Sequence, residues 1–206
     1  MIRTALFATA LFMPLALLAA CKDRDQAQQP EPAWFAMANT NLPAMRWGLQ
    51  PSGKLWTRST MQALLAGDGG PLIDLVPADI AEWCPAYAAN GDRERAAFWT
   101  GLLSALAKHE STYNERAVGG GGKWFGLVQI SPATARHYGC AASTGGRLKN
   151  GVNNLQCAVR IMAVTVPRDG VVAAGGRGVA ADWAPFKVAA KRADMMNWTA
   201  EQDFCR

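Results

Sequence analysis

The most regular stretch of the chain is residues 98–113, FWTGLLSALAKHESTY, and a glycine-rich segment separates it from GLVQI at residues 126–130. Apolar side chains recur in the first stretch at spacings of three and four residues, and the same line ends in an acid: Trp99, Leu103, Leu106 and Glu110. This spacing places all four on one face of an α-helix. The sequence therefore predicts an amphipathic helix that begins at the N-cap residue Asp92 and carries Glu110 on its buried side, at the C-terminal end.

Two features of this position are expected to raise the pKa of Glu110. Burial beside tryptophan and leucine side chains disfavours the charged carboxylate, and the C-terminal end of a helix carries partial negative charge. A carboxyl group that keeps its proton near neutral pH can serve as a general acid. The alternative is a glutamate that turns outward in a fraying last turn, and the periodicity alone leaves both open.

The composition fits one globular domain. The chain has 206 residues, of which 50% are hydrophobic, and this is enough for a single sizeable core. The three early tryptophans, Trp47, Trp56 and Trp83, are expected in that core. The net charge is +5, but the lysines and arginines are scattered and form no basic stripe, so nucleic acid is not an expected partner.

The N-terminus carries an export signal. Residues 1–20 hold an apolar run without an acid, which is typical of a secretory signal peptide. The run ends in Leu-Ala-Ala-Cys at residues 18–21, which resembles a bacterial lipobox and predicts lipidation of Cys21. The alternative is an ordinary signal peptide followed by an incidental cysteine. Residues 21–43 are expected to form the lipidated cysteine and a flexible tether, and residues 44–206 the folded domain.

This organisation predicts a periplasmic lipoprotein of a Gram-negative bacterium. Acyl chains on Cys21 would be its contact with the membrane. By resemblance to enterobacterial sorting, Lys22 is compatible with the outer membrane, where an aspartate would favour the inner membrane.

Five cysteines leave one unpaired in an exported protein, and lipidation of Cys21 accounts for it. The other four allow three pairings. We favour Cys140–Cys157 together with Cys84–Cys205. The alternative, free buried thiols, is less compatible with an oxidising compartment.

The pattern of the remaining sequence predicts a mainly helical protein. Helices are expected over residues 57–66, 77–85, 132–138, 150–164 and 185–196, whereas the glycine-rich residues 171–181 give no clear prediction. Ser131 and Pro132 form an N-cap and first-turn pair for the third of these helices. Neither His109 nor His137 lies at the spacing of a zinc site, so we expect no metal and no cofactor.

Three segments of the chain resemble the motifs of a known family. Glu-Ser-Thr-Tyr-Asn at residues 110–114, Gly-Leu-Val-Gln-Ile at residues 126–130, and Asn-Leu at residues 154–155 look like the signature of the soluble lytic transglycosylase (SLT) group. The resemblance covers about residues 96–165, with a catalytic core at about 92–165. It implies a goose-lysozyme-like fold, which is α+β with a minimal sheet, and cleavage of the glycan strands of peptidoglycan.

The resemblance assigns roles to individual residues. Glu110 matches the single catalytic acid/base, and Ser111 matches the residue that hydrogen-bonds to it and orients it. Gln129 matches the amide beside the scissile sugar. Gly126 and Leu127 match the segment that lines the floor of the cleft.

The residues that the family places on the opposite wall of the cleft are only partly present in this chain. Tyr113 lies within the motif and is expected to contact substrate. The family's downstream Tyr-Asn-x-Gly block is missing from this chain, and Trp183 is the aromatic residue that we expect to replace it.

The resemblance implies a lytic transglycosylase, which uses one carboxylate and leaves 1,6-anhydro ends instead of adding water. Most glycosidases use a pair of carboxylates, and nothing in the spacing of the other acids pairs one with Glu110: Glu115, Asp169, Asp182 and Asp194. Two alternatives remain, namely a hydrolytic muramidase and a non-catalytic envelope lipoprotein that binds peptidoglycan. Peptidoglycan is the expected partner, and the sequence does not predict protein partners.

Overall fold

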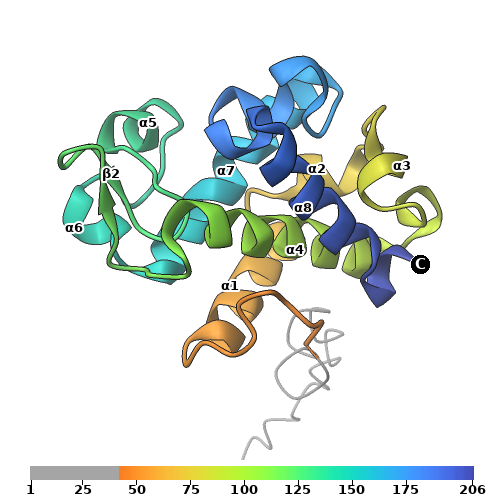
Figure 1. Ribbon diagram of the computed structural model, residues 1–206, viewed down its shortest axis with the longest axis horizontal. Coiled ribbons are helices and arrows are strands. Elements are labelled where there is room, and N and C mark those ends of the chain that lie inside the picture. Colours follow the sequence, from red (N-terminus) through yellow and green to blue (C-terminus); the bar gives the residue numbers. More distant parts are fainter. Residues whose placement is uncertain (1–41) are drawn as a thin grey trace, which may run out of the picture. The chain divides into compact units, whose positions relative to one another are not determined.

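The helix that carries Glu110 runs through the middle of the structure (Figure 1). The computed structural model describes residues 42–206. In it, helix α4 spans Asp92–Ser111, and every residue from 96 to 107 is buried. Helix α4 is therefore buried on more sides than the predicted amphipathic stripe, because α1, α2 and α8 all pack against it. A helix that is buried on several sides needs apolar or small residues around its whole circumference.

Helix α4 begins one residue earlier than predicted. Gly91 is the N-cap, and Asp92 is the first helical residue. The carboxylate of Asp92 therefore lies at the positive end of the helix dipole without capping a backbone N–H. At the other end, Thr112 is the C-cap in the left-handed conformation, with φ 52°.

The other elements are helices and one small sheet. In chain order they are α1 (Gly53–Ala66), α2 (Gly70–Asp74), α3 (Ile80–Trp83), η2 (Tyr87–Ala89), then after α4 β1 (Val118–Gly119), β2 (Trp124–Phe125), α5 (Pro132–His137), α6 (Gly145–Leu148), α7 (Gly151–Asp169), η3 (Ala174–Gly176), η4 (Gly178–Ala181), η5 (Ala184–Lys187), α8 (Ala189–Ala200) and η6 (Asp203–Cys205). Strands β1 and β2 are antiparallel, with Val118 opposite Phe125. The fold is mainly helical with a minimal sheet, as predicted for a lysozyme-like domain.

The long helix α7 is the second organising element, and α1 packs against both α7 and α4. Asn150 caps α7 by accepting from the backbone N–H of Asn153. The helix continues through Pro167 to Asp169, beyond the predicted end at residue 164. Ser131 caps α5 as predicted, because its side chain accepts from the N–H of Thr134.

Two disulfides fix the fold at distant points of the sequence. The structure contains both predicted pairs, Cys140–Cys157 and Cys84–Cys205. The second bond ties the C-terminal end to the segment after α3 across 121 residues. Closing a loop of that length is worth about 4–5 kcal/mol in the chain-entropy model. The early tryptophans are buried as predicted, at 0–3% exposure: Trp47, Trp56 and Trp83.

The predicted signal peptide, the lipidation site at Cys21 and nearly all of the tether lie outside the described residues. Within residues 42–206, no helix is both long and apolar enough to span a membrane.

Candidate active site

Glu110 lies in the last turn of α4, where the chain changes direction. Two consecutive residues after the helix, Thr112 and Tyr113, are left-handed, with φ of 52° and 65°. Their backbone N–H groups both point back to the carbonyl of Ala107 and close the helix. The helix end is therefore fixed in one conformation, and Glu110 does not lie in a fraying turn.

The carboxyl group of Glu110 is partly buried and unusually basic. Burial raises its pKa from 4.5 to about 7, and the positive charge of Lys191 on α8 partly opposes that rise. No group in the described part of the chain donates a hydrogen bond to this carboxyl, so only the charge of Lys191 compensates, in part, for the lost hydration of the charged form. Near neutral pH, Glu110 can therefore both donate and accept a proton.

Helix α8 is held beside Glu110 by a charged cluster. Asp194 accepts two hydrogen bonds from Arg46, at 2.6 and 2.9 Å. It also contacts Nε2 of His109 at 2.7 Å and Nζ of Lys108 at 3.3 Å. Since Lys191 lies one helical turn before Asp194, this anchor turns Lys191 toward Glu110. The sequence analysis did not find the cluster, because its members are up to 148 residues apart.

Ser111 does not orient Glu110 directly, which corrects the role implied by the family resemblance. Its hydroxyl donates instead to the carbonyl of Leu127, at 2.8 Å, or to that of Ala107, at 3.3 Å. Ser111 thus joins the end of α4 to the 126–130 segment. Its effect on Glu110 is to fix the position of the helix end relative to that segment.

The 126–130 segment is held from below by Asn154 of α7. The fully buried amide of Asn154 accepts from the N–H of Val128 and donates to the carbonyl of Phe125, both at 2.9 Å. Gly126 has a φ of 82°, and a Cβ there would overlap both Asn154 and the Leu148 carbonyl. Only glycine fits this position, so the role of Gly126 is to let the segment approach α7.

Two residues that we expected to contact substrate are part of the core instead. Leu127 is completely buried, and Trp183 is 3% exposed. The indole N–H of Trp183 donates to the Val128 carbonyl at 2.8 Å, which supports the segment from inside. The Trp183 ring therefore does not supply the expected aromatic contact, and Leu127 cannot meet substrate with its side chain, so its place in the segment that lines the cleft floor stays a prediction. Apolar side chains next to a buried turn gain more from the core than from a solvent-exposed wall.

Gln129 links the same segment to the β-hairpin. It is left-handed, with φ 49°, and its amide nitrogen donates to the carbonyl of Gly126 at 2.9 Å. A side chain on Gly119 of β1 would overlap its amide oxygen. Gln129 is partly exposed, so its predicted contact with substrate stays a prediction.

The hairpin presents an exposed aromatic ring that the sequence analysis did not single out. Trp124 on β2 is 47% exposed. Its ring occupies the space where a side chain on Gly120 would lie, and Gly120 has a φ of 56°. The glycines of the turn therefore let the ring lie directly on the backbone, which holds an exposed indole in a fixed orientation.

Tyr113 begins the connection from α4 to the hairpin. Burial raises the pKa of its phenol, Arg46 lowers it and Asp194 raises it, so the ring lies within range of the charged cluster. A groove of about 400 Å³ borders residues 112–116 and the start of α1. The predicted contact of Tyr113 with substrate stays a prediction, and this groove is a place where it could occur.

The other acids are engaged elsewhere. Glu115 accepts from the backbone N–H of Gly151 at 2.8 Å and so holds the start of α7. Asp169 is paired with the neighbouring arginine, and Asp182 accepts from the hydroxyl of Tyr138 at 3.2 Å. Within the described residues, no group of histidines, cysteines and acids could hold a metal ion. The site therefore offers acid–base chemistry centred on one carboxyl group.

Comparisons with known proteins agree with this arrangement. Residues 88–170 match the family model of the transglycosylase SLT domain. The wild-type structure titled Bd0314 DslA, form 2, superposes with a TM-score of 0.73 at 26% identity, and the match covers 81% of this chain and 100% of that one. Two glutamate-to-glutamine mutants of the same protein match equally well, with TM-scores of 0.73 and 0.72 at 26% and 25% identity and the same coverage of both chains. No curated protein matches the chain in sequence.

Proposed function

We propose that this chain, whose residues 88–170 match the transglycosylase SLT domain, cleaves the β-1,4 bond between N-acetylmuramic acid and N-acetylglucosamine in peptidoglycan without adding water. The observation that carries the proposal is Glu110, a partly buried carboxyl group with a pKa of about 7, whose one charged neighbour among residues 42–206 that shifts this pKa is Lys191 and not a second carboxylate. A group that titrates near neutral pH can act as the acid in one step and the base in the next.

The reaction would proceed in two proton transfers. Glu110 gives its proton to the glycosidic oxygen while the bond from that oxygen to C1 of N-acetylmuramic acid breaks, and the N-acetylglucosamine end leaves with a new hydroxyl. The acetamido group of the muramic acid stabilises the oxocarbenium-like centre at C1. The carboxylate of Glu110 then takes the proton of the C6 hydroxyl, whose oxygen closes on C1. The product is a 1,6-anhydro end, and Glu110 regains its proton.

Lys191 influences the balance between the protonated and the charged form of Glu110 during this cycle. Its positive charge favours the carboxylate form of Glu110 that exists between the two transfers. Burial favours the protonated form that starts the cycle. The two opposing effects keep both forms of Glu110 accessible at neutral pH.

Trp124 would supply the aromatic contact that the missing Tyr-Asn-x-Gly block leaves open. It lies on the hairpin directly after the catalytic helix, and it is exposed and held flat on the glycine turn. Aromatic faces bind the apolar faces of sugar rings, and a fixed indole loses little conformational entropy on binding. With Trp183 buried, Trp124 is the exposed tryptophan nearest in sequence to Glu110.

The non-catalytic alternative keeps one argument in its favour, since the absent Tyr-Asn-x-Gly block leaves the far wall of the cleft incomplete. The test is digestion of purified cell-wall sacculi by the wild type, by Glu110→Gln and by the control Glu201→Gln, which changes an exposed glutamate at the C-cap of α8. We expect Glu110→Gln to lose about 10²–10⁴-fold of the activity and the control to lose none. A wild-type protein that binds sacculi but releases nothing, with equal binding by Glu110→Gln, would favour the binding function.

The cellular place of the reaction follows from the N-terminus. We propose that Cys21 is lipidated and that residues 22–43 tether the domain to the outer membrane of a Gram-negative bacterium, facing the periplasm. Lys22 is compatible with the outer membrane, and the two disulfides support an oxidising compartment such as the periplasm.

A further inference from the structure

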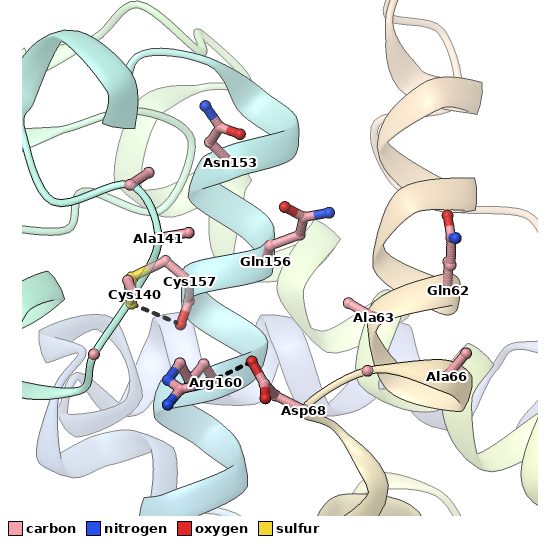
Figure 2. Close-up of a pocket in the computed structure, with 13 residues that line it drawn as sticks. Gln62, Ala63, Ala66, Asp68, Cys140, Ala141, Asn153, Gln156, Cys157 and Arg160 are labelled. Carbon is pink, nitrogen blue, oxygen red and sulfur yellow. Dashed lines mark hydrogen bonds and ion pairs between the residues drawn. A yellow bond between two sulfur atoms is a disulfide. The ribbon is translucent and has the colours of Figure 1, made fainter.

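A cavity of about 400 Å³ lies between α1 and α7, away from the residues assigned to catalysis. Its walls are the last turns of α1, the first half of α7 and the loop of residues 139–142 (Figure 2). The Cys140–Cys157 disulfide staples that loop to α7. The cavity is therefore bounded by two packed helices and a covalently fixed loop, so its shape is largely formed before any ligand arrives.

Exposed amide side chains from both helices line the cavity. Gln62 belongs to α1 and Gln156 to α7, and Figure 2 shows Gln156 pointing from α7 toward α1. Neither amide has a hydrogen-bond partner within residues 42–206. Asn153, one turn earlier on α7, uses its amide nitrogen for the Arg147 carbonyl at 3.3 Å and leaves its amide oxygen unpaired in the described structure. These groups offer donors and acceptors that match the backbone of a peptide.

One end of the cavity carries a solvent-exposed ion pair with unused hydrogen-bonding groups. Arg160 donates through Nη1 to Oδ2 of Asp68 at 2.8 Å, and through Nε to the Tyr138 carbonyl at 2.6 Å. In the described structure, Nη2 of Arg160 and Oδ1 of Asp68 have no partner. A carboxylate can bind the free Nη2 and an ammonium group the free Oδ1, so the pair is complementary to a group that carries both charges. A simple anion is less suitable, because Asp68 repels it.

The remaining lining is small and apolar. It consists of alanine side chains, namely Ala63, Ala66, Ala141 and Ala142, together with the disulfide. Among residues 42–206, no aromatic side chain lines the cavity, so this part of the chain gives it no stacking surface of the kind that a sugar ring would use. Methyl-sized side chains fit such a surface, and bulky ones do not.

We propose that this cavity binds the peptide stem of peptidoglycan, with alanine residues against the alanine-lined wall and the zwitterionic end of a diamino acid on Arg160 and Asp68. The inference rests on the proposed function, because peptidoglycan is the polymer that brings such peptides to the protein. A stem bound here lies outside the catalytic residues, so it would hold the domain on the wall while Glu110 acts on the glycan.

The test is calorimetric titration of the full-length protein, purified in detergent, with a synthetic stem peptide that contains alanine and an unlinked diamino acid. The wild type should bind. Gln62→Ala combined with Gln156→Ala should weaken binding about tenfold or more, as expected for two lost hydrogen bonds. Asn197→Ala, which removes an exposed amide of α8 outside the cavity, should bind like the wild type. Acetylating the free amine of the peptide should weaken binding by a similar factor.

Two outcomes would overturn the proposal, and both differ from failure of the catalytic function. The proposal is wrong if the wild type does not bind the free peptide, or if the double variant binds it as tightly as the wild type does. The peptide contains no glycosidic bond, so this titration is independent of cleavage. Cleavage of glycan strands stripped of their peptides should be unchanged in the double variant, because neither glutamine belongs to the catalytic site.

Discussion

Replacing Glu110 by glutamine should stabilise the folded protein at alkaline pH while it removes the activity. Glutamine has nearly the shape of a protonated glutamate and cannot ionise. In the wild type, burial raises the pKa of Glu110 from 4.5 to about 7. The folded state therefore binds the proton more tightly than the unfolded state, and the wild type loses stability as the pH rises from about 4.5 to about 7.

The size of the effect follows from the same pKa. At about 1.4 kcal/mol for each pH unit, a rise from 4.5 to about 7 corresponds to an upper bound of about 3 kcal/mol. Glu110 is only partly buried, so water screens part of this cost, and we expect about 1–2 kcal/mol. Glu110→Gln should thus be more stable than the wild type by that amount at pH 8, and the two should be equally stable at pH 4.

The assay is urea denaturation of both proteins at pH 4 and pH 8 with the disulfides intact, and the difference in the free energy of unfolding is the measured quantity. Glu201→Gln provides the control, because it makes the same chemical change at an exposed position outside the site. If Glu110→Gln is no more stable than the wild type at pH 8, or is equally displaced from it at both pH values, then burial does not raise the pKa of Glu110 in the folded protein.

Three further changes test other parts of the site. Trp124→Ala should weaken binding of sacculi by the inactive Glu110→Gln protein about tenfold, since it removes one aromatic contact worth roughly 1–2 kcal/mol. Trp124→Phe should keep most of the binding. Equal binding by all three proteins in a pull-down assay would exclude a role of Trp124 in binding sugar rings. Lys191→Met removes the charge that lowers the pKa of Glu110, so the alkaline limb of the kcat/KM profile should move to higher pH; an unmoved limb would separate Lys191 from the site. Asn154→Ala leaves two buried backbone groups unpaired and should lower the free energy of unfolding by about 2–4 kcal/mol in urea denaturation, whereas a loss well below 1 kcal/mol would contradict its role as the support of the 126–130 segment.

The sequence was informative where local patterns decide the structure. The stripe that ends at Glu110 predicted the central helix, because helical periodicity is a local property, but it left open whether Glu110 is buried or turned outward. The cap at Ser131 was also accessible, since capping residues follow simple rules, and cysteine parity indicated that four cysteines pair, although it left three pairings open.

The sequence was misleading where burial depends on contacts between distant segments. Leu127 and Trp183 stand next to motif residues, and no local pattern distinguishes an apolar side chain that faces a cleft from one that faces the core. The same limit hid Asp194, whose partner Arg46 is 148 residues away. It also hid the support that Asn154 gives to the 126–130 segment, because a buried amide and an exposed amide look alike in a sequence.

The most direct test of the account is the chemistry of the ends that the wild-type protein leaves on peptidoglycan. Sacculi digested to completion should release muropeptides that end in 1,6-anhydro-N-acetylmuramic acid, each lighter by one water than its hydrolytic counterpart in mass spectrometry. Glu110→Gln should release none of them. Muropeptides with reducing ends as the main wild-type product would contradict the account, because they require water, and not the C6 hydroxyl, to attack C1.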